Sequence, residues 1–218
     1  MKTISVVIPT MWKNNRLIHM IPLYQQCPFI NEIIIIDNSN EFHTKNLKRD
    51  KVTIYTPEKN IFVNPAWNMG VKLSSSDIVC IINDDISVDI RIFEYLSNQL
   101  PKGIIAGPHK DTFNNSNIEY NPSIEKTNSH TYGWGTFITL HKEDWIDIPN
   151  ELKVFYGDVW LFEYVKKECR TINNFIIHAD MNSTVTTVPE VNPIHIQEIE
   201  TWKTLHTLYQ KGDKLNWY

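Results

Sequence analysis

Two neighbouring carboxylates at the end of an apolar run are the strongest sign of chemistry in the sequence. Residues 77–83 read Asp-Ile-Val-Cys-Ile-Ile-Asn and lead directly into Asp84 and Asp85. Adjacent carboxylates repel each other, and hard divalent cations such as Mg²⁺ or Mn²⁺ bind one or two carboxylates while substrate phosphates complete their shell. The pair therefore predicts a cation site. Asp is also a favoured turn and capping residue, so the two residues could simply begin a turn.

Two other apolar runs also end in polar residues. Residues 4–8 lead into Pro9 and Thr10, and residues 33–36 lead into Asp37. Each run is continuous rather than alternating, which is typical of a strand that is buried on both faces. We therefore predict strands in both places, each with polar residues at its carboxyl end.

The segments between these strands have helical character. Residues 15–26 place apolar side chains at helical spacing, although Pro22 must kink or restart that helix. Asn64 and Pro65 suit the N-cap and the first position of a helix over 64–73.

Further elements continue this alternation. Strands are predicted over 52–56 and 103–107, and a helix that Asp89 would cap over 89–100. The β-α-β-α-β order predicts an α/β fold with a mostly parallel sheet and helices on both faces. Ligands bind beyond the carboxyl ends of the strands in such sheets, so the polar strand ends should converge on one site.

The second half of the chain is less regular. Residues 111–129 are polar and lack periodicity, which predicts a long loop or lid. Apolar patterns predict strands over 136–140 and 174–178 and helices over 158–167 and 195–211.

Composition bounds the class of protein. The chain has 218 residues, 42% of them hydrophobic, and a net charge of −4, which gives no overall basic surface for nucleic acid or anionic membranes. The three scattered cysteines indicate a reducing compartment. With no signal peptide and no apolar run of the roughly 20 residues that span a membrane, we expect a cytoplasmic protein without a membrane span. Frequent Asn and Ile suit an AT-rich bacterium or a phage in its host's cytoplasm.

Four motifs in order resemble the opening of family-two glycosyltransferases with the GT-A fold. They are a strand over 4–10 that ends in Pro-Thr, a strand over 33–39 that ends in Asp-Asn-Ser, an Asn-rich helix over 60–70, and a strand over 77–85 that resembles one ending in the family's "DXD" metal motif. The resemblance implies one GT-A domain over 1–218. Residues 1–100 would form its nucleotide-sugar-binding half, and residues 101–218 its acceptor half with a C-terminal helix.

The resemblance also implies roles at the matching positions. Pro9 and Thr10 would line the nucleotide pocket, and Asp37 would contact the base or the ribose. Asn68 would lie in the helix that walls this pocket. The cofactor would be a divalent metal, Mn²⁺ or Mg²⁺, and the donor a UDP- or GDP-sugar. Asp85 would bind the metal, with Asp84 nearer the ribose.

Asp158 is the candidate catalytic residue. It follows Gly157 in a segment that resembles the family's Glu-Asp motif, whose Asp is the general base of inverting members. Gly157 replaces the expected acid, and the family's downstream Arg has no clear match, although Arg170 or Lys166 could take its place. Asp158 could instead simply cap a helix.

Residues 132–136, which read Tyr-Gly-Trp-Gly-Thr, resemble the family's Gly-rich acceptor segment. Trp134 would stack on the acceptor, and Gly135 would allow its close approach. A tryptophan between glycines can equally be a packing anchor. His178 matches a late histidine that binds the metal in many GT-A enzymes, but it could be structural. His195, His130 and His109 have less support still.

Two other classes of function stay open. A nucleotidyltransferase also uses paired Asp residues and a metal, but residues 9–15 lack the Gly-rich loop that normally follows its first strand. A sugar- or nucleotide-binding module without turnover is the second alternative. The acceptor could be a glycan, a protein or a modified DNA base. The basic stretch 45–51 suggests a solvated surface or, alternatively, a phosphate contact.

Overall fold

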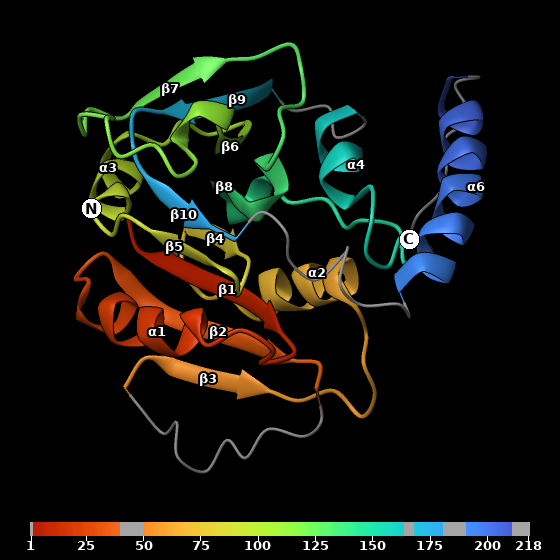
Figure 1. Cartoon of the computed structure of the whole chain (residues 1–218), viewed down its shortest axis with the longest axis horizontal. Helices are drawn as coiled ribbons and strands as arrows, with labels where there is room; N and C mark the ends of the chain where they lie inside the picture. The colour runs from red at the N-terminus through yellow and green to blue at the C-terminus, as the bar shows by residue number, and fades with distance from the viewer. Residues whose placement is uncertain (1, 40–49, 164–167, 181–190, 211–218) are drawn as a thin grey trace.

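A large twisted sheet organises the chain (Figure 1). The computed structural model describes residues 2–39, 50–163, 168–180 and 191–210. Within these residues the sheet has eight strands in the order β3-β2-β1-β4-β8-β6-β9-β7. Their bounds are β1 Ile4–Thr10, β2 Ile30–Asp37, β3 Val52–Tyr55, β4 Ile78–Ile82, β6 Ile104–Pro108, β7 Ser123–Lys126, β8 Phe137–His141 and β9 Glu168–Asn173.

The first four strands of this order are parallel, as the alternation of strands and helices predicts. β8 runs antiparallel to both β4 and β6, and β6 is parallel to β9. A second, two-stranded antiparallel sheet joins β5 (Ile86–Val88) to β10 (Ile177–Ala179). Every residue of β1, β4, β6 and β8 is buried, which explains why these strands read as continuous apolar runs.

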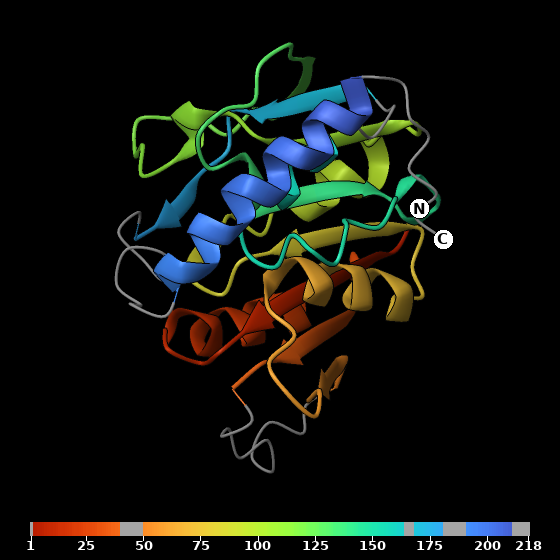
Figure 2. The ribbon, with the colours of Figure 1, turned by 90° about the vertical axis from the view of Figure 1, so that its right-hand side faces the viewer.

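Helices cover both faces of the sheet (Figures 1 and 2). α1 (Arg16–Gln26) and α3 (Ile92–Gln99) pack on one face, in a core that includes Ile4, Val6 and Ile8 of β1. α2 (Val63–Leu73), α4 (Gly157–Glu163) and α6 (Val191–Gln210) share the opposite core with Val7. Figure 2 shows α6 running across the outside of this second face. Short 3-10 turns are η2 (Lys110–Thr112), η3 (Trp134–Thr136) and η4 (Lys142–Asp144).

The mostly parallel α/β architecture is confirmed, and so is the first helix, which keeps Pro22 inside it. The helix starts differ. α2 begins at Val63, after Phe62 with φ 67°, so Asn64 lies in its first turn and is not the N-cap. α3 begins at Ile92, while the Asp89 carboxylate accepts a hydrogen bond from the Arg91 amide in the preceding turn.

The second half holds more strand than its sequence predicts. The segment 111–129 is not a structureless lid, because β7 lies within it and pairs with β9. The structure has no single strand over 174–178. β9 ends at Asn173, and β10 begins at Ile177, after a connection over 174–176. β9 lies near the edge of the sheet and mixes half-buried polar residues with buried ones, so it offers no continuous apolar run to recognise.

Some predictions fall outside the described residues. They concern most of the basic stretch 45–51 and the last residues of the helix predicted over 158–167, which include Lys166. Lys211, the last residue of the helix predicted over 195–211, also lies outside them. Among the helices that the structure does describe, none combines the length and the apolar character that crossing a membrane requires. The division into halves at residue 100 stays a prediction.

Candidate functional site

The carboxyl ends of β1, β2 and β4 lie side by side. Thr10 is the register partner of Asp37, and the Thr10 carbonyl accepts a hydrogen bond of 2.8 Å from the Asn38 amide. The Thr10 hydroxyl donates to Asp84 Oδ2 at 2.5 Å. The polar residues that end three separate strands are therefore in direct contact. We call this group, Thr10, Asp37, Asp84 and Asp85, the donor edge, after the sugar-nucleotide donor that the resemblance implies for these positions.

Asp37 presents a buried oxygen at this edge. The residue is 1% exposed, and its Oδ1 accepts hydrogen bonds from the amide and the hydroxyl of Ser39. Its Oδ2 is buried, and no residue in the described part of the chain donates to it. A buried carboxylate oxygen is costly without a donor, so this atom suits an N–H or O–H group of a ligand. Pro9 is also buried in β1, and its lining role stays a prediction.

The pKa of Asp84 is raised from 3.8 to about 6, mainly by burial. The hydrogen bond from Thr10 opposes this rise, and the neighbouring charge of Asp85 adds to it, as the adjacency of the two carboxylates predicts. A cation beside the pair would favour the charged form of both carboxylates. The pair therefore fits a divalent ion of the kind that keeps water or phosphate ligands.

His178 does not complete a closed metal site. It lies on β10 opposite Ser87, with an exposed side chain, just beyond the point where Asp85 leads into β5. Across the ranges that the structure describes, no three His, Cys, Asp or Glu residues gather closely enough to hold one ion. The roles of His178 and Asp85 as metal ligands stay predictions. Arg16 brings a cation to the same β5–β10 sheet, where it donates to Asp180 at 2.7 Å.

The second part of the site adjoins the donor edge through the backbone. The Asn83 amide donates to the Thr136 carbonyl at 3.0 Å, which fixes η3 next to Asp84. Gly135 in η3 in turn packs on Asp158, because a Cβ at Gly135 would lie 2.6 Å from Asp158 Oδ2. The structure thus brings the candidate base close to the donor edge. Gly135 is needed there for the close approach of the carboxylate, whatever its role toward an acceptor.

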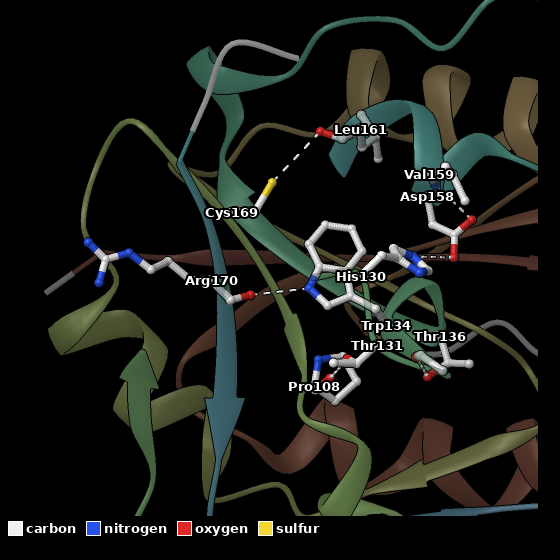
Figure 3. Close-up of polar contacts among 11 residues, drawn as sticks. Pro108, His130, Thr131, Trp134, Thr136, Asp158, Val159, Leu161, Cys169 and Arg170 are labelled. Carbon is white, nitrogen blue, oxygen red and sulfur yellow. Dashed lines mark hydrogen bonds and ion pairs between the residues drawn. The ribbon is translucent and has the colours of Figure 1, made fainter. Parts of the chain in front are cut away.

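His130, which the sequence supports only weakly as a metal ligand, pairs with Asp158 in this part of the site. Its Nε2 lies 3.0 Å from Asp158 Oδ2 (Figure 3). The hydrogen bond could not be predicted, because the two residues lie 28 positions apart and His130 directly follows the polar segment 111–129, which has no periodicity. We call His130, Gly135 and Asp158 the acceptor side, after the acceptor role that the resemblance implies for residues 132–136.

Trp134 is a packing anchor in this structure. It is 0% exposed, its indole N–H donates to the Arg170 carbonyl at 3.1 Å, and its ring leaves no room for a Cβ on Gly107. No face of the indole is open for stacking, so burial supports the packing alternative. The exposed aromatic residue of the segment is Tyr132, which is 69% exposed.

Gly157 departs from the family pattern for a steric reason. A Cβ at Gly157 would collide with the side-chain amide of Asn64, so an acid does not fit there. Arg170 does not stand in for the missing arginine. Its guanidinium pairs with Glu168 at 2.8 Å and points away from Asp158 (Figure 3).

A carboxylate on α6 holds the loop that leads into Asp158. Glu198 is 1% exposed and accepts hydrogen bonds from three consecutive backbone amides, those of residues 153–155. Tyr156, with φ 60°, stacks on Trp202 at a ring distance of 5.2 Å. From the other side, the side-chain amide of Asn64 donates to the backbone carbonyls of Leu152 and Phe155. We call the contacts of Glu198 and Trp202 the α6 clasp. An acidic residue in an amphipathic helix usually marks a solvated face, so the sequence carries no sign of it.

The Asn68 side chain bonds to the backbone of Ile148. Its side-chain amide donates to the Ile148 carbonyl and accepts from the Ile148 amide, at 2.8 and 2.9 Å. It lies in the wall of a cavity of about 580 Å³ between α2 and residues 147–151. Its contribution to a donor pocket stays a prediction, and these bonds give it a role in holding that segment.

The fold is that of GT-A-type glycosyltransferases. No protein-family model and no curated protein sequence matches the chain. Among solved structures, the crystal structure of GalNAc-T7 with UDP, GalNAc and Mn²⁺ matches 82% of this chain with a TM-score of 0.61 and 12% identity. S. aureus TarS 1–349 matches 81% with a TM-score of 0.60 and 14% identity, and its complex with UDP matches 81% with a TM-score of 0.59 and 13% identity.

The chain spans 44% of the GalNAc-T7 chain and 60% of TarS 1–349. At these identities the similarity establishes the fold. The GT-A expectation is therefore confirmed, while the family-two assignment stays a prediction.

Proposed function

We propose that the chain is a glycosyltransferase that moves a sugar from a nucleotide-diphosphate sugar to an acceptor hydroxyl. The observation that carries the proposal is the hydrogen bond between Asn83 and Thr136, which joins the donor edge to the side that holds Asp158. The GT-A fold supports it, because the solved structures of similar fold include GalNAc-T7 with UDP and TarS with UDP. We take a UDP-sugar as the first candidate donor and a GDP-sugar as the second.

The donor edge would bind the nucleotide. The buried Oδ2 of Asp37 suits a hydrogen bond from the base or the ribose, and Pro9 and Thr10 would form the wall beside it. Asp84 and Asp85 would hold a divalent cation, Mn²⁺ or Mg²⁺, with His178 nearby. When bound, such a cation neutralises the charge of the diphosphate and stabilises it as a leaving group.

Asp158 would act as the general base of an inverting transfer. A carboxylate at this place can accept the proton of the acceptor hydroxyl while the hydroxyl oxygen attacks the anomeric carbon, which contributes about 10²- to 10⁴-fold to the rate. The contact with Gly135 supports the role, because it places the carboxylate beside the segment that adjoins Asp84. The acceptor class stays open among glycans, proteins and modified DNA bases.

A product assay tests the proposal. Purified protein is incubated with UDP- and GDP-sugars, with Mn²⁺ or with EDTA, and the released nucleotide is identified. We expect slow release of nucleoside diphosphate with water as acceptor. This release should fall sharply in Asp85→Ala and persist in the control Asp111→Ala, which removes an exposed aspartate of η2.

The other classes of function give other results. Release of pyrophosphate would indicate a nucleotidyltransferase, and binding of sugar nucleotides without any product would indicate a binding module. Equal binding by the wild type and Asp85→Ala would contradict the proposed role of Asp85 in holding the metal.

A further inference from the structure

His130 and Asp158 form a hydrogen-bonded pair whose geometry is fixed from both sides. The two side chains are 26% and 27% exposed, so the pair is shielded without being closed to a substrate. The His130 ring packs edge-on against Phe162 at 5.5 Å and lies 5.7 Å from the buried ring of Trp134. These contacts hold the imidazole in one orientation, with Nε2 directed at the carboxylate (Figure 3).

The carboxylate is held as firmly as the ring. Asp158 Oδ1 accepts a hydrogen bond of 3.0 Å from the Val159 amide. Its Oδ2 lies between His130 and the backbone of Gly135, where even a methyl group would not fit. An exposed ion pair between mobile side chains has no such constraints and contributes little. The arrangement therefore resembles that of a base whose partner determines its position.

The segment that carries His130 is itself anchored to the sheet. The Thr131 hydroxyl donates to the Pro108 carbonyl at the end of β6 (Figure 3). The Thr136 hydroxyl donates to the Gly133 carbonyl. The Thr136 carbonyl accepts from Asn83 at the donor edge. One short segment thus links the imidazole to the end of β6 and to the end of β4.

We propose that His130 is the positioning residue of Asp158, and this inference rests on the proposed function. The Nε2–H of His130 donates to Oδ2 and leaves the remaining lone pairs of the carboxylate for the acceptor hydroxyl. As the acceptor O–H bond breaks, its proton passes to Asp158 and its oxygen bonds to the anomeric carbon. The bond from that carbon to the diphosphate oxygen breaks, and its electron pair leaves with the nucleoside diphosphate. His130 keeps the protonated carboxyl group in place until the proton is lost to water.

Kinetics on two variants separate positioning from packing. The His130→Gln side chain can place an N–H near the position of Nε2, whereas His130→Ala removes the hydrogen-bond donor to Asp158. We expect kcat for nucleoside diphosphate release to fall on the order of 10- to 100-fold in His130→Ala, at unchanged donor KM, because a displaced catalytic group costs rates of this size. His130→Gln should recover most of the loss. His109→Gln, which removes a histidine from the pair with Asp111, is the matched control and should keep the wild-type rate.

Two results would overturn the inference: an unchanged kcat in His130→Ala, or equal losses in His130→Ala and His130→Gln, which would reduce His130 to a packing role. An unchanged kcat in His130→Ala would overturn it whether or not the KM for the sugar nucleotide rises.

A spectroscopic readout keeps the test independent of activity. Long-range ¹H–¹⁵N spectra of the histidine rings, assigned with His130→Gln, should show a protonated Nε2 whose resonance shifts in Asp158→Ala. An unshifted His130 signal would overturn the pair. If the wild type releases no nucleotide from any donor, the proposed function fails, and these spectra still decide whether the pair exists.

Discussion

The donor edge and the acceptor side are built by different means. Neighbouring parallel strands of one sheet hold Thr10, Asp37 and Asp84 together, so backbone register sets their positions. The acceptor side depends on side-chain contacts between distant segments, such as His130 with Asp158. Many backbone hydrogen bonds together fix the register of neighbouring strands, whereas a side-chain contact depends on one or two residues. We therefore expect single substitutions to disturb catalysis on the acceptor side while nucleotide binding at the donor edge persists.

The largest expected effect tests this division at Asp158. Asp158→Asn removes the basic oxygen but keeps the size of the side chain, and should lower kcat by about 10²- to 10⁴-fold. Binding of the donor, measured by titration calorimetry, should stay within twofold of the wild type, roughly the scatter of a neutral substitution. A large loss of donor affinity would mean that the two regions are not separable.

Gly135 should give the next largest effect. In Gly135→Ala the new methyl group would displace the Asp158 carboxylate, and we expect turnover to fall on the order of 10- to 100-fold with little change in donor affinity. Gly103→Ala is the control. Gly103 has φ 78° and open space around its missing Cβ, so this variant should lose stability but keep its rate. Similar rates for the two variants would contradict the steric account.

The α6 clasp predicts a loss of stability together with a smaller loss of rate. Glu198→Ala leaves three half-buried backbone amides without their acceptor and should lower the free energy of unfolding by about 1–3 kcal/mol. Turnover should fall by less than in Gly135→Ala, since the loop before Asp158 loosens while the carboxylate remains. The control is Glu200→Ala on the exposed face of α6, which should change stability by less than about 0.5 kcal/mol. Equal denaturation curves for the two variants would contradict the clasp.

The smallest effect concerns the pH dependence of stability at the donor edge. Burial raises the pKa of Asp84 from 3.8 to about 6, so the folded state binds this proton more tightly than the unfolded state. The stabilisation from Asp84 is therefore complete below pH 3.8 and is lost as the pH rises through about 6. Asp84→Asn keeps an acceptor for Thr10 and removes the charge. We compare the melting temperatures of the wild type and Asp84→Asn in EDTA at pH 4 and at pH 7. Between these pH values the melting temperature of the wild type should fall by a few degrees relative to that of the variant, since each kcal/mol lost corresponds to about 2–4 °C. A difference that is constant with pH would contradict the burial of Asp84.

The two regions also differ in how far the sequence predicts them. Continuous apolar runs identify β1, β2 and β4, and the alternation of these strands with helices is enough to place Thr10, Asp37 and Asp84 at one edge of the sheet. β9 has no such pattern, because half-buried polar residues interrupt its buried ones near the sheet edge.

Contacts between distant side chains are also missed. The match to a family motif selects Asp158, but its partner His130 and the Glu198 carboxylate carry no local pattern. The steric demand of Asn64 that excludes an acid at Gly157 arises only from the packing of α2 against α4.

A crystal structure of the protein with a UDP-sugar and Mn²⁺ would test the proposed site most directly. We predict that the uracil or the ribose contacts Asp37, that the diphosphate lies beside Asp84 and Asp85, and that the anomeric carbon faces Asp158. A nucleotide bound away from the donor edge, for example in the cavity between α2 and residues 147–151, would contradict this prediction.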